Sequence, residues 1–120
     1  MELELEPVAG TFAVLRLEPG APLPDCEWFA ATRTPDELSL IVREADAASL
    51  DARVETGFFA WRVRGPLPFD AVGVLAGLAE PLRTARIPLL AVSTFETDYV
   101  FVRDADGARR AWAASGIRVT

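Results

Sequence analysis

Residues Ile87–Arg103, IPLLAVSTFETDYVFVR, hold two apolar runs on either side of the polar segment STFETD at positions 93–98. Both runs are rich in β-branched and aromatic residues, which favour strands. Two such runs around a short polar segment are typical of an antiparallel hairpin with a tight turn. We therefore predict a hairpin that places hydroxyl groups and carboxylates at the ends of two buried strands.

The segments on either side of this hairpin complete a regular order of elements. A strand-like run at 58–64, FFAWRVR, is followed by Gly65-Pro66, which ends a strand because proline cannot donate to the ladder. Helical stretches lie at 70–82 and 104–116, and a short strand, IRVT, follows the second of them. The order strand, helix, strand, strand, helix, strand is the ferredoxin-like (βαββαβ) plan. It predicts an α+β fold with two helices on one face of an antiparallel sheet.

The two helices have predictable ends and buried faces. Asp70 is well placed to cap the first helix, and Pro81 predicts a kink or an early end because it removes a backbone hydrogen bond. The second helix should begin near Asp104 and end at Gly116. Residues at spacings of three and four should be buried, namely Val72, Leu75, Ala76, Ala79 and Leu82 in the first helix and Ala108, Ala111, Trp112 and Ser115 in the second.

The N-terminal half is predicted to consist mostly of strands. Residues 11–17, TFAVLRL, alternate as a strand does, and the runs 28–34 and 37–44 should pair through the turn dipeptide Pro35-Asp36. Residues 44–56 are polar, which predicts a connector with one helical turn at most. The expected domains are therefore a strand-rich half, residues 1–55, and a βαββαβ half, residues 56–120.

Composition excludes several classes of partner. The chain of 120 residues carries a net charge of −6, so no surplus of basic side chains is left to neutralise nucleic acid or an anionic membrane. No apolar run approaches the ~18 residues that a membrane span needs. The N-terminal residues MELELEPVAG are too acidic and too weakly apolar for a signal peptide. We expect a cytoplasmic protein without a nucleic-acid or membrane partner.

The residue types also argue against catalysis. The sequence has no histidine and a single cysteine, Cys26, so it holds neither a Ser-His-Asp triad nor the ligands of a cysteine or histidine metal centre. A carboxylate general base remains possible with 18 acidic residues, but no pair of them lies in an apolar segment where a shifted pKa would be expected. The prediction is that the chain is not an enzyme, with no catalytic residue, no metal site and no cofactor.

Four segments resemble a known family. They are FAWRVRGPLPF at 59–69, GVLA at 73–76, Pro81-Leu82 and AVSTFETDYV at 91–100, and together they look like the ACT domains of the CASTOR and aspartate-kinase type, in particular small stand-alone bacterial members. The resemblance implies two ACT-like halves, the first of them rich in strands. It further implies allosteric regulation of a partner protein, with a free amino acid bound at the junction of two ACT units.

An amino-acid site can be placed from chemistry. The free N–H groups at the start of the first helix suit the ligand carboxylate, and Gly73, which lacks a Cβ, permits close approach. The α-ammonium group suits Asp70 or the strand edge at 92–94, and Asp98 or Glu96 suits a cationic side chain. The predicted ligand-binding residues are Phe69, Asp70, Val72, Gly73, Val92, Ser93, Thr94, Thr97 and Asp98.

Each of these residues also has a purely structural interpretation. Asp70 can simply cap the helix, Gly73 and Gly77 can simply allow close packing, and the hydroxyls of 93–97 can simply bond to local backbone. The leading hypothesis is a non-enzymatic amino-acid-binding regulatory module. It is expected to form a homodimer, because edge strands of the N-terminal half favour sheet extension. The alternative is a protein–protein interaction module that has lost its pocket, and a third option is a small-molecule enzyme that uses carboxylate chemistry.

Overall fold

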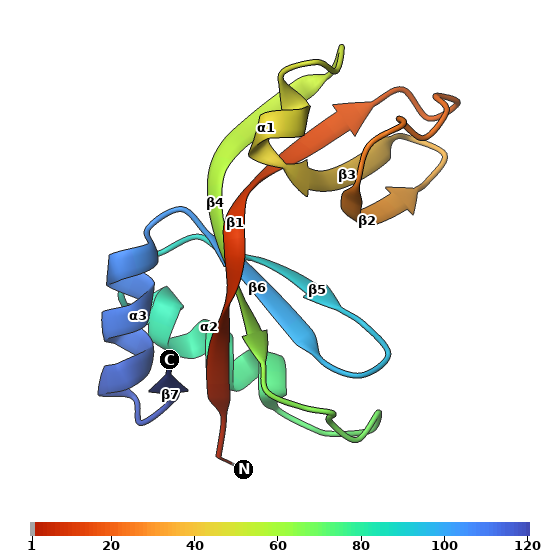
Figure 1. The fold of residues 1–120 in the computed structure, drawn as a ribbon. Coiled ribbons are helices and arrows are strands. Elements are labelled where there is room, and N and C mark those ends of the chain that lie inside the picture. Colours follow the sequence, from red (N-terminus) through yellow and green to blue (C-terminus); the bar gives the residue numbers. More distant parts are fainter. Residues whose placement is uncertain (1) are drawn as a thin grey trace. The chain divides into compact units, whose positions relative to one another are not determined.

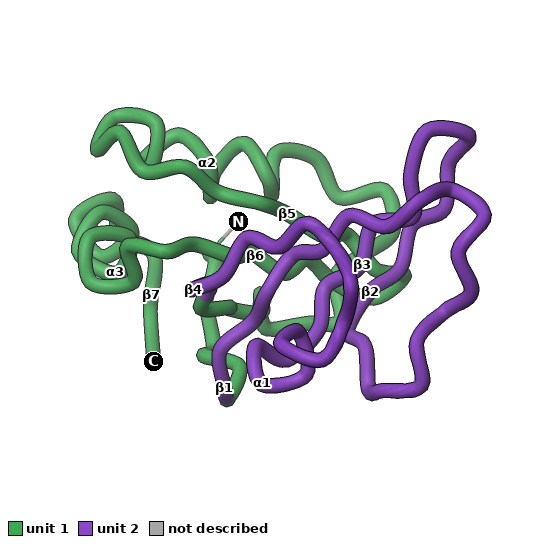
Figure 2. The backbone as a smooth tube through the Cα atoms, turned by 90° about the horizontal axis from the view of Figure 1, so that it is seen from above, with its two compact units in different colours: residues 1–9, 59–120 green, residues 10–58 purple. Residues whose placement is uncertain are grey.

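The computed structural model describes residues 2–120 and shows an α+β protein made of two compact units. The first unit combines the N-terminal residues up to Ala9 with Phe59–Thr120, and the second comprises Gly10–Phe58 (Figure 2). Strands β1 (Glu4–Leu17) and β4 (Arg53–Val63) are each divided between the units, with one segment in the first unit and the other in the second. The predicted division into residues 1–55 and 56–120 stays a prediction.

The first unit has the predicted βαββαβ order. Strand β4 is followed by α2, β5, β6, α3 and β7 (Figure 1), whose bounds are Val74–Thr84, Leu90–Ser93, Asp98–Val102, Ala105–Ala114 and Arg118–Val119. Strands β5 and β6 pair antiparallel, with Ser93 opposite Asp98, and β6 pairs antiparallel with β4. The hairpin and the α+β, ferredoxin-like fold are confirmed. No helix within residues 2–120 is both long and apolar enough to cross a membrane.

The last strand has an unexpected neighbour. Strand β7 runs parallel to β1, with Glu4 opposite Arg118, and β1 in turn lies beside β4. The backbone N–H of Arg64 donates to the Glu4 carbonyl at 2.8 Å, and the two side chains form an ion pair at 3.1 Å. The N-terminal segment is therefore a strand of the first unit, which the sequence interpretation missed although ELELE alternates with the period of a strand.

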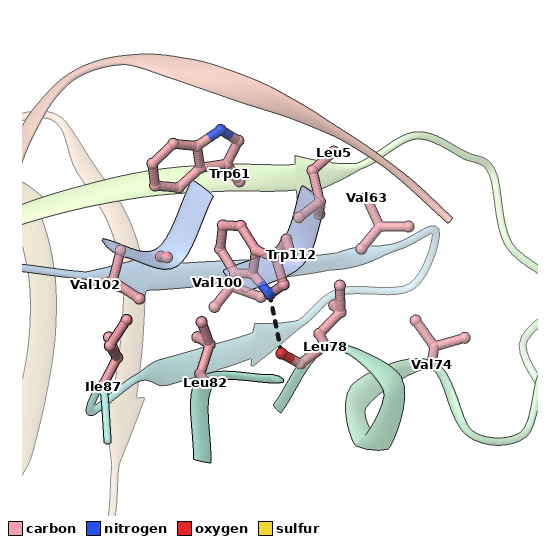
Figure 3. Packing of buried hydrophobic residues seen from close by; sticks show 11 residues of the cluster. Leu5, Trp61, Val63, Val74, Leu78, Leu82, Ile87, Val100, Val102 and Trp112 are labelled. Carbon is pink, nitrogen blue, oxygen red and sulfur yellow. Dashed lines mark hydrogen bonds between the residues drawn. The ribbon is translucent and has the colours of Figure 1, made fainter. Parts of the chain in front are cut away.

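The core of the first unit is built around two tryptophans (Figure 3). The rings of Trp61 and Trp112 meet edge to face with centroids 5.2 Å apart. The Trp112 indole Nε1 donates to the Leu78 carbonyl at 2.9 Å, which ties α3 to α2. The buried residues of this cluster are Leu5, Trp61, Val63, Val74, Leu78, Leu82, Ile87, Val100, Val102, Ala108 and Trp112.

Helix α2 differs from the prediction at its start and in its buried face. It begins at Val74 with Gly73 as N-cap in the left-handed conformation (φ 85°), so the prediction that Asp70 caps it is wrong. Its buried residues are Val74, Leu78 and Leu82, whereas Val72 lies before the helix and is 90% exposed. The helix continues through Pro81 to Thr84.

Helix α3 matches the prediction closely. Asp104 is its N-cap, and its Oδ1 accepts a hydrogen bond from the Gly107 N–H at 2.9 Å. Ala108 and Trp112 are buried as predicted, but Ser115 is exposed. The acidic run at its start is therefore explained by capping.

The second unit is mostly sheet, as predicted. Strand β3 (Leu38–Arg43) pairs antiparallel with both β1 and β2 (Trp28–Arg33). A single turn, α1 (Glu44–Ala47), follows β3, and β4 already begins at Arg53, so the predicted connector is shorter than expected. The buried cluster of this unit comprises Ala13, Leu15, Leu38, Leu40, Val42 and Ala47.

Candidate functional site

A pocket of about 400 Å³ opens in the first unit between two segments that the sequence marks as polar or irregular. One wall is the loop from Leu67 into the first turn of α2, as far as Ala76. The other wall is the segment Ser93–Asp98, which joins β5 to β6. Both walls come from one unit, so a single compact body forms the whole pocket.

The structure brings six of the nine predicted site residues to this pocket, and these are Phe69, Gly73, Ser93, Thr94, Thr97 and Asp98. The remaining three, Asp70, Val72 and Val92, do not line it. Asp70 lies in an exposed turn and Val72 projects into solvent, because the chain reaches α2 later than predicted. Ligand binding by these residues stays a prediction.

Hydrogen bonds hold the two walls together. The Leu67 N–H on the first wall donates to the Glu96 carbonyl on the second wall at 2.7 Å. The Thr97 hydroxyl is buried and donates to the Val63 carbonyl, 2.6 Å away at the end of β4. The Thr94 hydroxyl donates to the Thr97 carbonyl at 3.0 Å and accepts from the Thr97 N–H at 3.3 Å. Both threonine hydroxyls thus shape the turn, as the structural interpretation of these residues expected.

The start of α2 lines the pocket and has no side-chain cap. The first hydrogen bond within this helix runs from the Gly77 N–H to the Gly73 carbonyl, and no side chain caps the N-terminus. The N–H groups of Val74, Leu75 and Ala76 therefore lack acceptors within the helix. A Cβ built on Gly73 meets nothing within 4 Å, so tight packing does not explain this glycine. Its positive φ accounts for a glycine at this position, and the close approach of a ligand beside it stays a prediction.

Two exposed aromatic rings stand at the pocket. Phe69 is 80% and Phe95 81% exposed, and their ring centroids are 5.5 Å apart. Large apolar side chains with this exposure mark interaction sites when they gather in one place. The sequence interpretation named Phe69 but missed Phe95, an aromatic residue in the middle of a polar turn.

The charges of the pocket are all negative. Glu96 and Asp98 are the two charged residues among the described side chains that line it. Residues 2–120 contain no group of three or more histidine, cysteine, aspartate or glutamate side chains placed to hold a metal ion. Cys26 lies in the second unit, and burial together with the nearby carboxylates of Asp46 and Asp25 raises the pKa of its thiol. A raised pKa keeps the thiol protonated and makes it a poor nucleophile.

The segment that contains this pocket also matches a family model. Residues 53–109 match the model described as the ACT domain. This segment is therefore similar to an ACT domain. The match begins in β4, includes both walls of the pocket and ends within α3.

Solved structures extend the comparison over the whole chain. A protein of Agobacterium tumefaciens is 28% identical over 100% of this chain and 93% of its own, with a TM-score of 0.89. A Vibrio cholerae protein of unknown function, described as a possible transport protein, is 22% identical over 96% and 91%, with a TM-score of 0.80. The aspartate kinase of Clostridium acetobutylicum, an allosteric enzyme, is 9% identical over 89% of this chain and 33% of its own, with a TM-score of 0.64. No curated protein matches the chain. The ACT fold therefore occurs both in small proteins of similar length and in a regulated kinase.

Proposed function

We propose that this protein is a non-enzymatic regulatory module whose ACT domain binds a free amino acid. The observation that supports the proposal most strongly is the pocket, whose walls are the uncapped start of α2 and the turn of the β5–β6 hairpin. An ACT domain is a regulatory domain, and the similar fold in an allosteric aspartate kinase fits a role in regulation. The proposed compartment is the cytoplasm.

The pocket offers complementary groups for both ends of an amino acid. The N–H groups of Val74–Ala76 and the positive end of the helix dipole suit the α-carboxylate. The carboxylate of Asp98 on the opposite wall suits the α-ammonium group, because a charge-assisted hydrogen bond is stronger than a neutral one. The volume of about 400 Å³ lies in the range of small-molecule sites.

Regulation would operate through a change in assembly or in the affinity for a partner protein. A ligand can shift such an equilibrium only by the difference between its affinities for the two states. The proposed assembly is a homodimer, and strand β2 at the edge of the second unit's sheet is the proposed contact. Static light scattering at tens of micromolar should give the mass of a dimer, and the mass of a monomer would contradict this part of the proposal.

A thermal-shift screen against the twenty amino acids at millimolar concentration tests the proposal. A ligand present at 100 times its dissociation constant adds about 2.7 kcal/mol to the free energy of unfolding, which raises the Tm of a domain of this size by several degrees. The expected result is a rise with one chemical group of amino acids. A flat response to all twenty would contradict amino-acid binding.

The second candidate function is a protein–protein interaction module. The pair of exposed rings, Phe69 and Phe95, favours it because exposed aromatic residues frequently anchor protein interfaces. This function predicts no thermal response to amino acids. Substituting both rings by serine should then abolish binding of the partner without changing the fold.

A further inference from the structure

We propose that the second unit contains a conformational latch, in which the side chain of Glu44 holds two bent strands and its release lets both strands change their curvature together. The two strands are β1 and β4, which are neighbours in the sheet and are each divided between the two compact units. The latch lies within residues 10–58, whereas the pocket described above lies in the first unit.

Both strands contain a glycine with a positive φ. Gly10 in β1 has a φ of 97°, and Gly57 in β4 has a φ of 87°. A glycine in this conformation within a strand bends the strand, as it does in a β-bulge. Gly10 is the first residue of the second unit, and Gly57 is next to its last residue, Phe58. Both strands therefore bend at the boundary of that unit.

The backbone alone does not fix these two bends. Glycine adopts positive and negative values of φ about equally readily, so each strand can bend or straighten at little steric cost. Positions that absorb a change in φ and ψ in this way are typical of hinges. A bend that is held in one conformation therefore needs an interaction from outside its own strand.

Glu44, the first residue of the turn α1, supplies this interaction. Its Oε1 accepts a hydrogen bond from the Gly57 N–H at 2.7 Å, and its Oε2 accepts one from the Thr11 hydroxyl at 3.4 Å. Thr11 directly follows Gly10 in β1. One carboxylate thus joins the two strands at their bends, and the shorter bond goes to the backbone of a bent residue.

The residue before Glu44 contacts the other glycine. A Cβ on Gly10 would collide with the guanidinium of Arg43, so the missing side chain lets this group lie against the backbone of β1. The same guanidinium lies over the ring of Phe12, 5.0 Å from its centroid. Both bends are therefore held by one dipeptide, Arg43-Glu44, and a movement of this dipeptide frees both strands at once.

Hydrogen exchange of the full chain, measured by NMR, tests whether Glu44 holds the bend in β4. In Glu44→Ala the Gly57 N–H loses its acceptor, and we expect its exchange to become at least tenfold faster. Glu44→Gln keeps an oxygen acceptor without the charge, so the increase should be smaller, about threefold. The control Asp46→Ala removes the other carboxylate of α1 and should change the exchange at Gly57 by less than twofold.

The position of the effect separates a latch from general support of the fold. In Glu44→Ala the exchange of the Leu40 and Val42 amides, in the buried centre of β3, should change by less than twofold. Acceleration of these amides by the same factor as Gly57 would show that Glu44 only contributes to global stability, and it would overturn the proposal. Unchanged exchange at Gly57 would overturn it as well. If Glu44→Ala does not fold, the same comparison in Glu44→Gln decides.

Relaxation dispersion on the same samples tests whether the two strands move together. We expect the amides next to Gly10 and Gly57 to show exchange on the microsecond-to-millisecond timescale in the Glu44 variant, with one common rate constant for β1 and β4. A residue that merely supports one strand would not produce a shared rate. Different rate constants in the two strands, or no dispersion in either, would overturn the latch.

Discussion

The hydroxyl group of Thr97 donates a hydrogen bond of 2.6 Å to the carbonyl oxygen of Val63, 34 residues earlier in the chain. Thr97 is the one buried polar residue among the described residues 2–120. Its hydrogen bond fixes the wall of the pocket to the end of β4, the strand that leads into the opposite wall. The geometry of the pocket therefore depends on Thr97, whose hydroxyl group already donates to the Val63 carbonyl.

Replacing Thr97 by valine should destabilise the protein by about 1–3 kcal/mol, because the buried Val63 carbonyl loses its partner while the side chain keeps its shape. Urea unfolding monitored by circular dichroism measures the change. Thr97→Ser retains the hydroxyl and should lose less stability than Thr97→Val. A larger loss in Thr97→Ser than in Thr97→Val would show that the methyl group, and not the hydrogen bond, holds this wall.

Gly73→Ala should destabilise the protein by about 1 kcal/mol, because residue 73 has a φ of 85° and a side chain disfavours this conformation. Gly77→Ala is the matched control within α2, where a Cβ would make only an ordinary contact of 3.5 Å with Leu3. This second variant should be neutral or more stable, because alanine favours a helix interior over glycine. A reversed order of the two stabilities in thermal unfolding would contradict the assigned start of α2.

Trp112→Phe should destabilise the protein by about 2–4 kcal/mol, since it removes both buried ring volume and the donor to the Leu78 carbonyl. The control Trp28→Phe changes a tryptophan that is 41% exposed and should cost much less. Chemical unfolding of the two variants gives the comparison. Similar losses would indicate that the edge-to-face tryptophan pair is not the centre of the first unit's core.

The thiol of Cys26 should react slowly with iodoacetamide in the native protein. Burial, followed by the carboxylates of Asp46 and Asp25, raises the pKa of this thiol, so less thiolate is present at a given alkaline pH than in the unfolded chain. The direction of this pKa shift also predicts how stability depends on pH. Because the thiol has a higher pKa in the folded state than in the unfolded state, the free energy of unfolding falls as the pH rises through the range where the unfolded thiol ionises. Mass spectrometry of samples alkylated with and without urea follows the reaction. A faster reaction in the native protein would contradict the raised pKa.

The parts of the fold that follow from local patterns could be predicted from the sequence. The hairpin around Ser93–Asp98 combines strand periodicity with a polar turn, and α3 combines an Asp104 cap with Gly116 after its last turn. Each of these sequence patterns lies within a few neighbouring residues and agrees with the way the hairpin and α3 pack in the first unit. Local chemistry and tertiary structure therefore led to the same answer.

The misplaced elements depended on information that is not local. Strand β1 is recognised as part of the first unit only through its pairing with Arg64 and β7. The face of α2 was misplaced because Val72 fits a helical spacing, while the left-handed Gly73 delays the helix by several residues. Phe95 could be read from the sequence as an exposed turn residue, but its position beside Phe69 depends on the way two distant loops meet.

The central claim, that an amino acid binds between the start of α2 and the β5–β6 turn, is tested most directly by two-dimensional NMR. Backbone amide signals of the full chain are recorded while an amino acid selected by the thermal screen is added. We expect concentration-dependent shifts at Val74, Leu75 and Ala76 and at the segment Ser93–Asp98, with little change in the second unit. An absence of shifts at the start of α2, or shifts confined to another surface, would contradict the account.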